Sequence, residues 1–305
     1  SLVLPCLNEA GSVGLVVRQA LDAFDKAGIA GDVIVADNGS TDGSQEAAAT
    51  AGAQVVHQPV RGYGAALQAG IAAARGEIVV MADADATYPV ERIMDLVRPV
   101  LAGDADMVVG ARWSGATMRT MPFLHRFVGT PVLTWLVRRA GGPSGLTDSQ
   151  SGLRAFRREA LIGLGLRSTG MEFASEMLIV AGRDRWRIME IATGYRQRIG
   201  ASKLDTVADG WRHLKTIVLL APDLVATYPG IALLAVGALV TWFGLVPTGV
   251  LRVGSPGWLA AFLGPMLLVL GAEAVLAGAV LAGWSPVGRP RILGRDAAAF
   301  RHACF

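Results

Sequence analysis

The chain has 305 residues, of which 52% are hydrophobic and 17% charged, and its mean hydropathy of +0.44 is higher than that of an ordinary soluble domain. Its net charge of +3 is too small to indicate a nucleic-acid-binding protein. Cys6 and Cys304 are too few and too far apart for a disulfide framework or a zinc site, which fits a reducing, cytosolic environment.

Predicted strands and helices alternate along the first part of the chain. Apolar runs predict strands at residues 1–5, 32–36, 54–57 and 77–82, and helical patterns follow residues 8–9 and cover 65–74. The resulting βαβαβαβ order predicts an α/β fold with a doubly wound, mostly parallel sheet.

Polar residues follow two of these strands. The second strand continues into residues 37–43, a DNGSTDG sequence with the composition of a turn. The fourth ends in Asp83-Ala84-Asp85, which places two carboxylates at the edge where open α/β sheets bind ligands. Such a pair suits Mg²⁺ or Mn²⁺ carrying a diphosphate, although one Asp could instead cap the next helix while the other is solvated.

Two later segments combine apolar and basic residues. Residues 121–139 form a basic amphipathic pattern that suits a membrane interface or, equally, a core. For residues 207–220, directly before the apolar C-terminal part, the interfacial interpretation is favoured. Glu172 and Glu176 lie one turn apart on a predicted helix and could orient arginines.

Residues 230–251 and 258–284 are almost continuously apolar over lengths that can cross a bilayer. They predict two transmembrane helices, the alternative being buried helices of a large soluble core. The basic residues flank the pair, which predicts that the N-terminal α/β domain and the C-terminus are cytoplasmic. Glu273, inside the second span, marks a helix contact or an oligomer interface.

Seven short motifs occur in a fixed order between residues 4 and 204. They are LPCLNE (4–9), ADNGSTDGS (36–44), RGYGAAL (61–67), DADATYP (83–89), GAR (110–112), DSQSGLRAF (148–156) and RIGASKL (198–204). Together they resemble the family 2 glycosyltransferases of GT-A fold, in particular the dolichyl-phosphate mannose synthase-like branch. That branch moves a sugar from a nucleotide to a polyprenyl phosphate.

The resemblance implies which residues hold the donor. Asp37 would hydrogen-bond the base, although Ala36 stands where the family often has a second carboxylate. Asp85 would be the direct metal ligand, with Asp83 also at the metal and nearer the ribose. The full donor set is Pro5, Asn8, Glu9, Asp37, Gly39, Arg61, Gly64, Asp83, Ala84 and Asp148.

The resemblance also implies an acceptor site of positive charge. Arg112 and Arg126 match the arginines that bind the acceptor phosphate, and Arg198, Ser202 and Lys203 match a later phosphate-binding stretch. A phosphate monoester with a second pKa near ~6 is mostly a dianion at neutral pH and needs no strong general base. Asp85, Arg112 and Arg126 are therefore the expected catalytic residues.

The sequence thus predicts inverting transfer of a hexose from a UDP- or GDP-sugar to a dolichyl, undecaprenyl or decaprenyl phosphate. Rival interpretations are an enzyme of the same fold that uses a hydroxyl acceptor and a true base, and a non-catalytic membrane scaffold. Expected parts are a GT-A domain (1–205), an amphipathic juxtamembrane helix (206–228), spans at 229–251 and 257–284, and a cytoplasmic tail (285–305). The spans are expected to anchor the enzyme in the bilayer and to contact a second copy.

Overall fold

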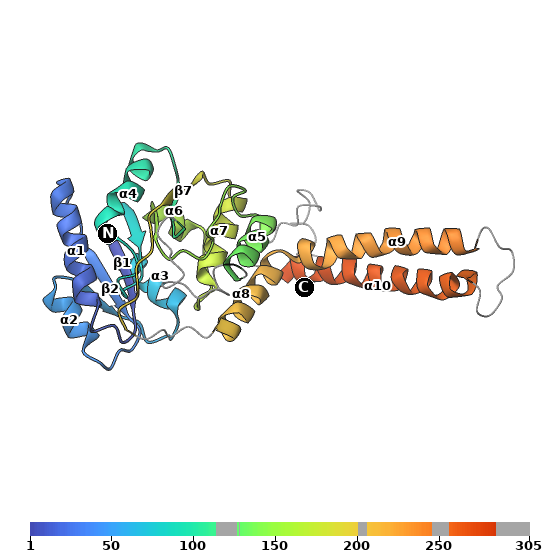
Figure 1. Cartoon of the computed structure of the whole chain (residues 1–305), viewed down its shortest axis with the longest axis horizontal. Coiled ribbons are helices and arrows are strands. Elements are labelled where there is room, and N and C mark those ends of the chain that lie inside the picture. The colour runs from blue at the N-terminus through green and yellow to red at the C-terminus, as the bar shows by residue number, and fades with distance from the viewer. Residues whose placement is uncertain (114–126, 128, 201–205, 246–255, 285–305) are drawn as a thin grey trace. The chain divides into compact units, whose positions relative to one another are not determined.

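The computed structural model describes residues 1–113, 127, 129–200, 206–245 and 256–284 (Figure 1). The chain divides into two compact units, Ser1–Thr216 and Ile217–Phe305. The boundary between them falls inside the predicted juxtamembrane segment 206–228.

The first unit is built on a seven-stranded sheet of order β3-β2-β1-β4-β6-β5-β7. Its strands are β1 (Leu2–Cys6), β2 (Val33–Asp37), β3 (Gln54–His57), β4 (Ile78–Met81), β5 (Met107–Ala111), β6 (Arg154–Arg157) and β7 (Ile188–Ala192). All neighbours are parallel except β6, which runs antiparallel to both β4 and β5. The predicted α/β fold with a mostly parallel sheet is confirmed.

The register brings the ends of three strands to one edge. Pro5 pairs with Ala36 and Cys6 with Asp37, while Val3 pairs with Met81 at the end of β4. The carboxyl ends of β1, β2 and β4 therefore lie side by side, and the residues that follow them share this edge. This is the edge at which open α/β sheets bind ligands.

Helices cover both faces of the sheet. They are α1 (Val13–Ala27), α2 (Ser44–Thr50), α3 (Tyr63–Ala73), α4 (Ile93–Ala102) after the 3₁₀ turn η1 (Val90–Arg92), α5 (Thr130–Ala140), α6 (Arg158–Gly163) and α7 (Phe173–Arg183). Because strand side chains alternate, Leu2 and Leu4 join the core under α1 and α4, whereas Val3 meets Gly70 of α3. Strands buried on both faces explain the continuous apolar runs from which they were predicted.

The two basic amphipathic segments are partly described. Residues 130–140 form α5, where Val132 is 51% and Trp135 52% exposed, so these two side chains are not core residues. Residues 114–126 and 128 lie outside the described part of the chain. The second segment forms α8 (Thr206–Leu220), whose Trp211 is 59% exposed.

The second unit holds the two predicted spans. A short π-helical turn, η3 (Asp223–Thr227), leads into α9 (Tyr228–Leu245), and α10 covers Pro256–Trp284. By length and composition Asp223–Phe243 and Ala261–Gly283 are candidate membrane spans. Only 11% and 17% of their most apolar windows is buried within the chain, which argues against two core helices of a soluble protein.

Glycines bring α9 and α10 together along their length (Figure 1). A Cβ on Gly230 would lie 2.8 Å from the carbonyl oxygen of Gly271, and a Cβ on Gly237 would lie 2.9 Å from that of Gly264. The glycines of each helix are seven residues apart and therefore lie on one face. They allow the close backbone approach that is common between membrane helices.

Candidate functional site

Asp83 and Asp85 follow β4 directly, at the predicted edge of the sheet. Neither caps the next helix: no side chain caps η1 or α4, and the Asp85 Oδ1 instead accepts the backbone N–H and the hydroxyl of Thr87, at 3.1 and 2.6 Å. The Asp83 Oδ1 accepts the hydroxyl of Tyr63 at 3.0 Å. Ala86 has a φ of +63°, so the backbone turns sharply just after the pair.

Electrostatics at the pair suit a cation. Burial and the charge on Asp85 raise the pKa of Asp83 to about 7, because two neighbouring carboxylates disfavour each other's charge. Carboxylate oxygens are the ligands that Mg²⁺ and Mn²⁺ prefer. Among the described residues no third Asp, Glu, His or Cys joins them.

Gly152 closes one side of this carboxylate pair. A Cβ at this position would lie 3.0 Å from both Asp83 carboxylate oxygens and from the Tyr63 hydroxyl oxygen. The Gly152 backbone N–H donates to the hydroxyl of Tyr88 at 2.7 Å. The glycine therefore allows the loop before β6 to approach Asp83 as closely as it does.

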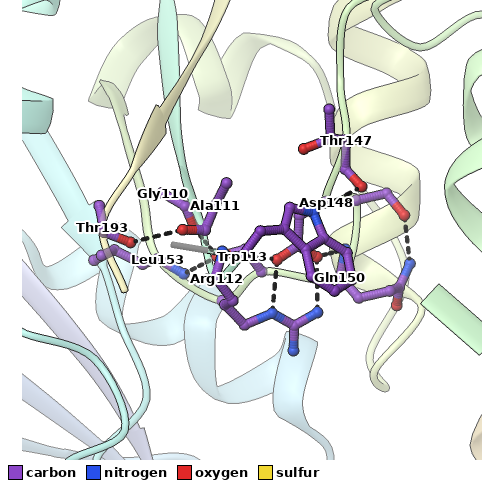
Figure 2. A network of polar contacts seen from close by, with 12 residues as sticks. Gly110, Ala111, Arg112, Trp113, Thr147, Asp148, Gln150, Leu153 and Thr193 are labelled. Atoms are coloured by element: carbon purple, nitrogen blue, oxygen red, sulfur yellow. Dashed lines mark hydrogen bonds and ion pairs between the residues drawn. The ribbon is translucent and has the colours of Figure 1, made fainter. Parts of the chain in front are cut away.

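Arg112 and Asp148 form a two-pronged ion pair (Figure 2). Arg112 donates from Nε to Oδ2 and from Nη2 to Oδ1, both at 2.7 Å, and its backbone N–H reaches Oδ2 at 3.1 Å. The Asp148 side chain is fully buried, and its partner's guanidinium stacks 5.6 Å from the ring of Tyr195. Burial alone would lower the pKa of Arg112, but Tyr88 and Asp148 raise it, so the guanidinium stays charged.

The loop that carries Asp148 is held from both sides. The carboxylate of Glu190, on β7, accepts the backbone N–H groups of Thr147 and Asp148 at 2.6 and 3.2 Å. Ser151 donates its hydroxyl to the carbonyl of Gly110 at the end of β5. These bonds fix the loop against β5 and therefore fix the orientation of the Arg112 fork.

Arg154, at the start of β6, was not predicted as a site residue. It is fully buried and donates to three backbone carbonyls, those of Ser149, Ser151 and Ala174, at 2.9, 3.1 and 2.7 Å. Burial lowers its pKa to about 10. The signal in the sequence was an arginine next to the apolar residues Ala155 and Phe156 in the DSQSGLRAF motif.

Asp37 organises the turn after β2. Its carboxylate accepts the backbone N–H groups of Gly39 and Ser40 at 3.1 and 3.2 Å and the Gln45 side-chain amide at 2.7 Å. Burial raises the pKa of Asp37, but these hydrogen bonds outweigh it and leave the pKa below its ordinary value. Asp37, the residue expected to bind the base, thus also stabilises the turn predicted at this position.

The loops after β1 and β2 are clamped together. Asn8, at a φ of +53°, accepts the Thr41 backbone N–H at 2.8 Å and donates its own to the hydroxyl of Ser40 at 2.8 Å. Glu9 donates its backbone N–H to Ser44, and its carboxylate pairs with Arg198. These contacts place Asn8 and Glu9 beside the turn of Asp37.

Several other predicted residues lie away from the carboxylate pair or outside the described part of the chain. Arg61 lies beside Gly39, since a Cβ there would be 3.5 Å from the Arg61 Nη2, and Gly64 packs on the backbone of residues 168–170. Glu176 accepts the backbone N–H groups of Arg167 and Ser168, so it orients that loop rather than an arginine side chain. Arg126, Ser202 and Lys203 lie outside the described residues.

Comparison with known proteins places the chain in a family. Residues 1–165 match the family described as Glycosyl transferase family 2, which is more than half of the chain. The chain belongs to glycosyl transferase family 2. It is 37% identical over 279 residues to the low-salt glycan biosynthesis hexosyltransferase Agl6 of Haloferax volcanii, covering 89% of this chain and 67% of that protein.

A second relative of this family 2 glycosyltransferase is the dolichyl-phosphate hexose transferase of the same organism. The two are 32% identical over 222 residues, covering 72% of this chain and 92% of the relative. Among solved structures, the glucosyl-3-phosphoglycerate synthase of Mycobacterium tuberculosis with Mn²⁺, UDP and its product is 28% identical. That match has a TM-score of 0.56 and covers 72% of this chain and 77% of the other.

Proposed function

We propose that this glycosyltransferase transfers a hexose from a nucleoside diphosphate sugar to a polyprenyl phosphate, with inversion at the anomeric carbon. One observation carries the proposal: the carboxylates Asp83 and Asp85 share the edge of the sheet with the ion-paired guanidinium of Arg112, whose side chain is only 12% exposed. The acidic group suits a cation-bound diphosphate, and the basic group suits an anionic acceptor.

The donor would bind across the ends of β1, β2 and β4. Asp37 and Asn8, which is bonded to the turn after Asp37, would hold the base. Asp83 would lie nearer the ribose. Mg²⁺ or Mn²⁺ would be held by Asp85 and Asp83 and would supply positive charge beside the departing diphosphate. The solved relatives that contain UDP with Mn²⁺ or with Mg²⁺ support this assignment.

The carboxylates that the structure describes at this edge all have other partners or roles, which favours a phosphate over a hydroxyl as the acceptor. Asp148 is bound to Arg112, Glu9 is paired with Arg198, and Asp83 and Asp85 are assigned to the cation. Asp37 accepts hydrogen bonds from Gly39, Ser40 and Gln45 within its own turn. No described carboxylate at this edge is thus left to act as a base for a hydroxyl. A phosphate dianion needs none, because its oxygen can attack the anomeric carbon directly while the diphosphate leaves from the opposite side.

We further propose that the acceptor's phosphate is presented at the membrane surface. Trp135 of α5 is half exposed and stacks with Arg139 at 5.6 Å, and exposed Trp211 on α8 is followed by Arg212 and Lys215. Exposed aromatic rings beside basic side chains suit the headgroup region. The named activity of the dolichyl-phosphate hexose transferase supports a polyprenyl acceptor, and the flanking positive charge supports a cytoplasmic catalytic unit.

The test is to incubate membranes containing the protein with UDP- and GDP-hexoses and with a polyprenyl phosphate, and to identify the glycolipid by mass spectrometry. The expected product is a β-linked polyprenyl-phosphate hexose. Asp85→Asn is the matched control: the amide oxygen can still accept from Thr87, so the turn persists, but the charge offered to the cation is lost. A product linked to a hydroxyl, or full turnover by a folded Asp85→Asn protein, would refute the proposal.

A further inference from the structure

A segment of extended chain crosses the end of β4 beside the carboxylate pair. The Arg196 N–H donates to the carbonyl of Thr87 at 2.8 Å, and the Ile199 N–H donates to the carbonyl of Asp85 at 3.1 Å. These two bonds fix residues 196–199 alongside residues 85–87. Arg198 lies between the two anchors, so its backbone is held next to Asp85.

The Arg198 guanidinium is shared between two carboxylates. Its Nη1 lies 3.4 Å from the Asp85 Oδ2, and its Nη2 pairs with Glu9 Oε1. Nε is buried, and among the described residues it has no hydrogen-bond partner. The guanidinium is therefore only partly satisfied where it lies, and it carries a donor that an added acceptor could use.

The two oxygens of Asp85 have different partners. Oδ1 accepts both bonds from Thr87, whereas Oδ2 is the oxygen that faces Arg198. Oδ2 is consequently the oxygen that remains for a cation. Two positive groups next to a single carboxylate oxygen repel each other, and the repulsion is strong where water is scarce.

We infer that Arg198 and the divalent cation compete for Asp85 Oδ2. In the donor-free enzyme Arg198 neutralises this carboxylate, and the cation binds weakly. When the diphosphate arrives with the cation, its negative charges accommodate both positive groups, and Arg198 turns from Asp85 to the phosphate oxygens. The inference rests on the proposed function, because it assumes a nucleoside diphosphate at this edge.

The consequence is a coupling between cation and nucleotide. Because the competitor is removed only when the nucleotide supplies new acceptors, each ligand strengthens binding of the other by the same factor. Arg198 would then prevent the cation from occupying the site without the donor. It is a residue that sets the order of binding as well as a contact to phosphate.

The decisive variant is Arg198→Gln, studied in the full-length purified protein. Mn²⁺ binding without nucleotide is measured by the electron paramagnetic resonance signal of the unbound ion. The variant removes a positive charge whose Nη1 lies 3.4 Å from the proposed ligand oxygen Asp85 Oδ2. Mn²⁺ should therefore bind at least about fivefold more tightly than to the wild-type protein. Arg198→Lys keeps the positive charge and should keep most of the competition.

Arg196→Gln is the matched control. This arginine lies two residues away on the same segment, is half exposed and pairs with Glu91 rather than with Asp85. Its replacement should leave the nucleotide-free Mn²⁺ affinity unchanged. Adding Asp85→Asn to Arg198→Gln should abolish the gain, which locates the tighter binding at Asp85.

The sign of the effect separates the inference from a structural role. A residue that merely supports the site would weaken Mn²⁺ binding when removed, so equal or weaker binding by a folded Arg198→Gln protein overturns the inference. With UDP present, the variant should lose nucleotide affinity and most of the coupling. The proposed function is tested separately by glycolipid formation in the wild-type protein, whatever the change in nucleotide-free affinity.

Discussion

The imidazole Nδ1 of His213, on α8, lies 2.9 Å from the hydroxyl of Ser175, on α7. The Gln150 amide nitrogen Nε2 also reaches this hydroxyl, at 3.3 Å, and the backbone N–H of Gln150 donates to Asp148 at 3.3 Å. His213 and Ser175 are both buried. A hydrogen-bonded chain therefore connects His213 of α8 with the Asp148–Arg112 ion pair.

Ser175→Ala should destabilise the protein by roughly 1–3 kcal/mol, because it removes a buried hydroxyl that serves both His213 and Gln150. It should also reduce transfer, since Gln150 is bonded to Asp148. The measurement is thermal unfolding in detergent together with the transfer rate. Thr50→Ala, at the exposed end of α2, is the control and should change neither. Wild-type stability of the Ser175 variant would contradict the predicted role.

Arg112→Lys should weaken acceptor use far more than donor binding. Lysine keeps a positive charge beside Asp148 but cannot make the planar two-pronged contact with that carboxylate. Asp148 therefore stays neutralised, while the fixed orientation of the cation that would bind the acceptor phosphate is lost. Loss of one or two charge-assisted bonds corresponds to about a ten- to hundredfold rise in acceptor KM. Calorimetry with UDP and Mn²⁺ checks the donor site. Weakened nucleotide binding with normal acceptor kinetics would show that Arg112 serves the donor instead.

Asp37 should make stability depend on pH in the acidic range. Its pKa is lower in the folded protein than its ordinary value near ~3.9, so its contribution is fully present above that value. The contribution of Asp37 to the free energy of unfolding is lost as the pH falls through its lower pKa in the folded protein. Urea unfolding of wild type and Asp37→Asn between about pH 3 and pH 6 isolates the effect. The stability difference should shrink as the pH falls, and a constant difference would rule out the assignment.

Gly237→Leu should destabilise the helical hairpin. A Cβ there would lie 2.9 Å from the Gly264 carbonyl oxygen, so α9 and α10 would have to separate, at a cost of about 1–3 kcal/mol for overpacking. Gly283→Leu is the control, because no atom lies within 4 Å of a Cβ at that position. Protection of α9 and α10 from proteolysis in detergent gives the readout. Equal protection of both variants would mean that the glycine contact is not needed.

The fold was predictable where local pattern decides it. Residues 33–36 and Ile78–Met81 are apolar because they are buried on both faces of the sheet. The polar residues that follow them lie at the ligand-binding edge of such sheets. The antiparallel insertion of β6 between β4 and β5 was not predicted. Strand order depends on which strands pair in the folded protein, and local sequence does not determine it. The short strand β6 also overlaps the DSQSGLRAF motif, which was interpreted as a site motif and not as a strand.

The site was predictable in its residue types and less so in their partners. The motifs pointed to Asp83, Asp85 and Arg112, but the fork between Arg112 and Asp148 joins residues that are 36 positions apart. The contact between Arg198 and Asp85 spans a still larger separation. No local rule encodes such pairs, because they follow from which loops the sheet brings to one edge.

The glycine contact within the hairpin limits how two copies could meet in a membrane. Small residues that often join separate helices are already used between α9 and α10, where Gly230 lies against Gly271 and Gly237 against Gly264. The outward surface instead carries bulky residues, among them Trp242 and Leu276, and the exposed carboxylate of Glu273. A contact between copies through the spans would therefore have a wider helix spacing than the hairpin itself, and it would have to provide Glu273 with a hydrogen-bond donor.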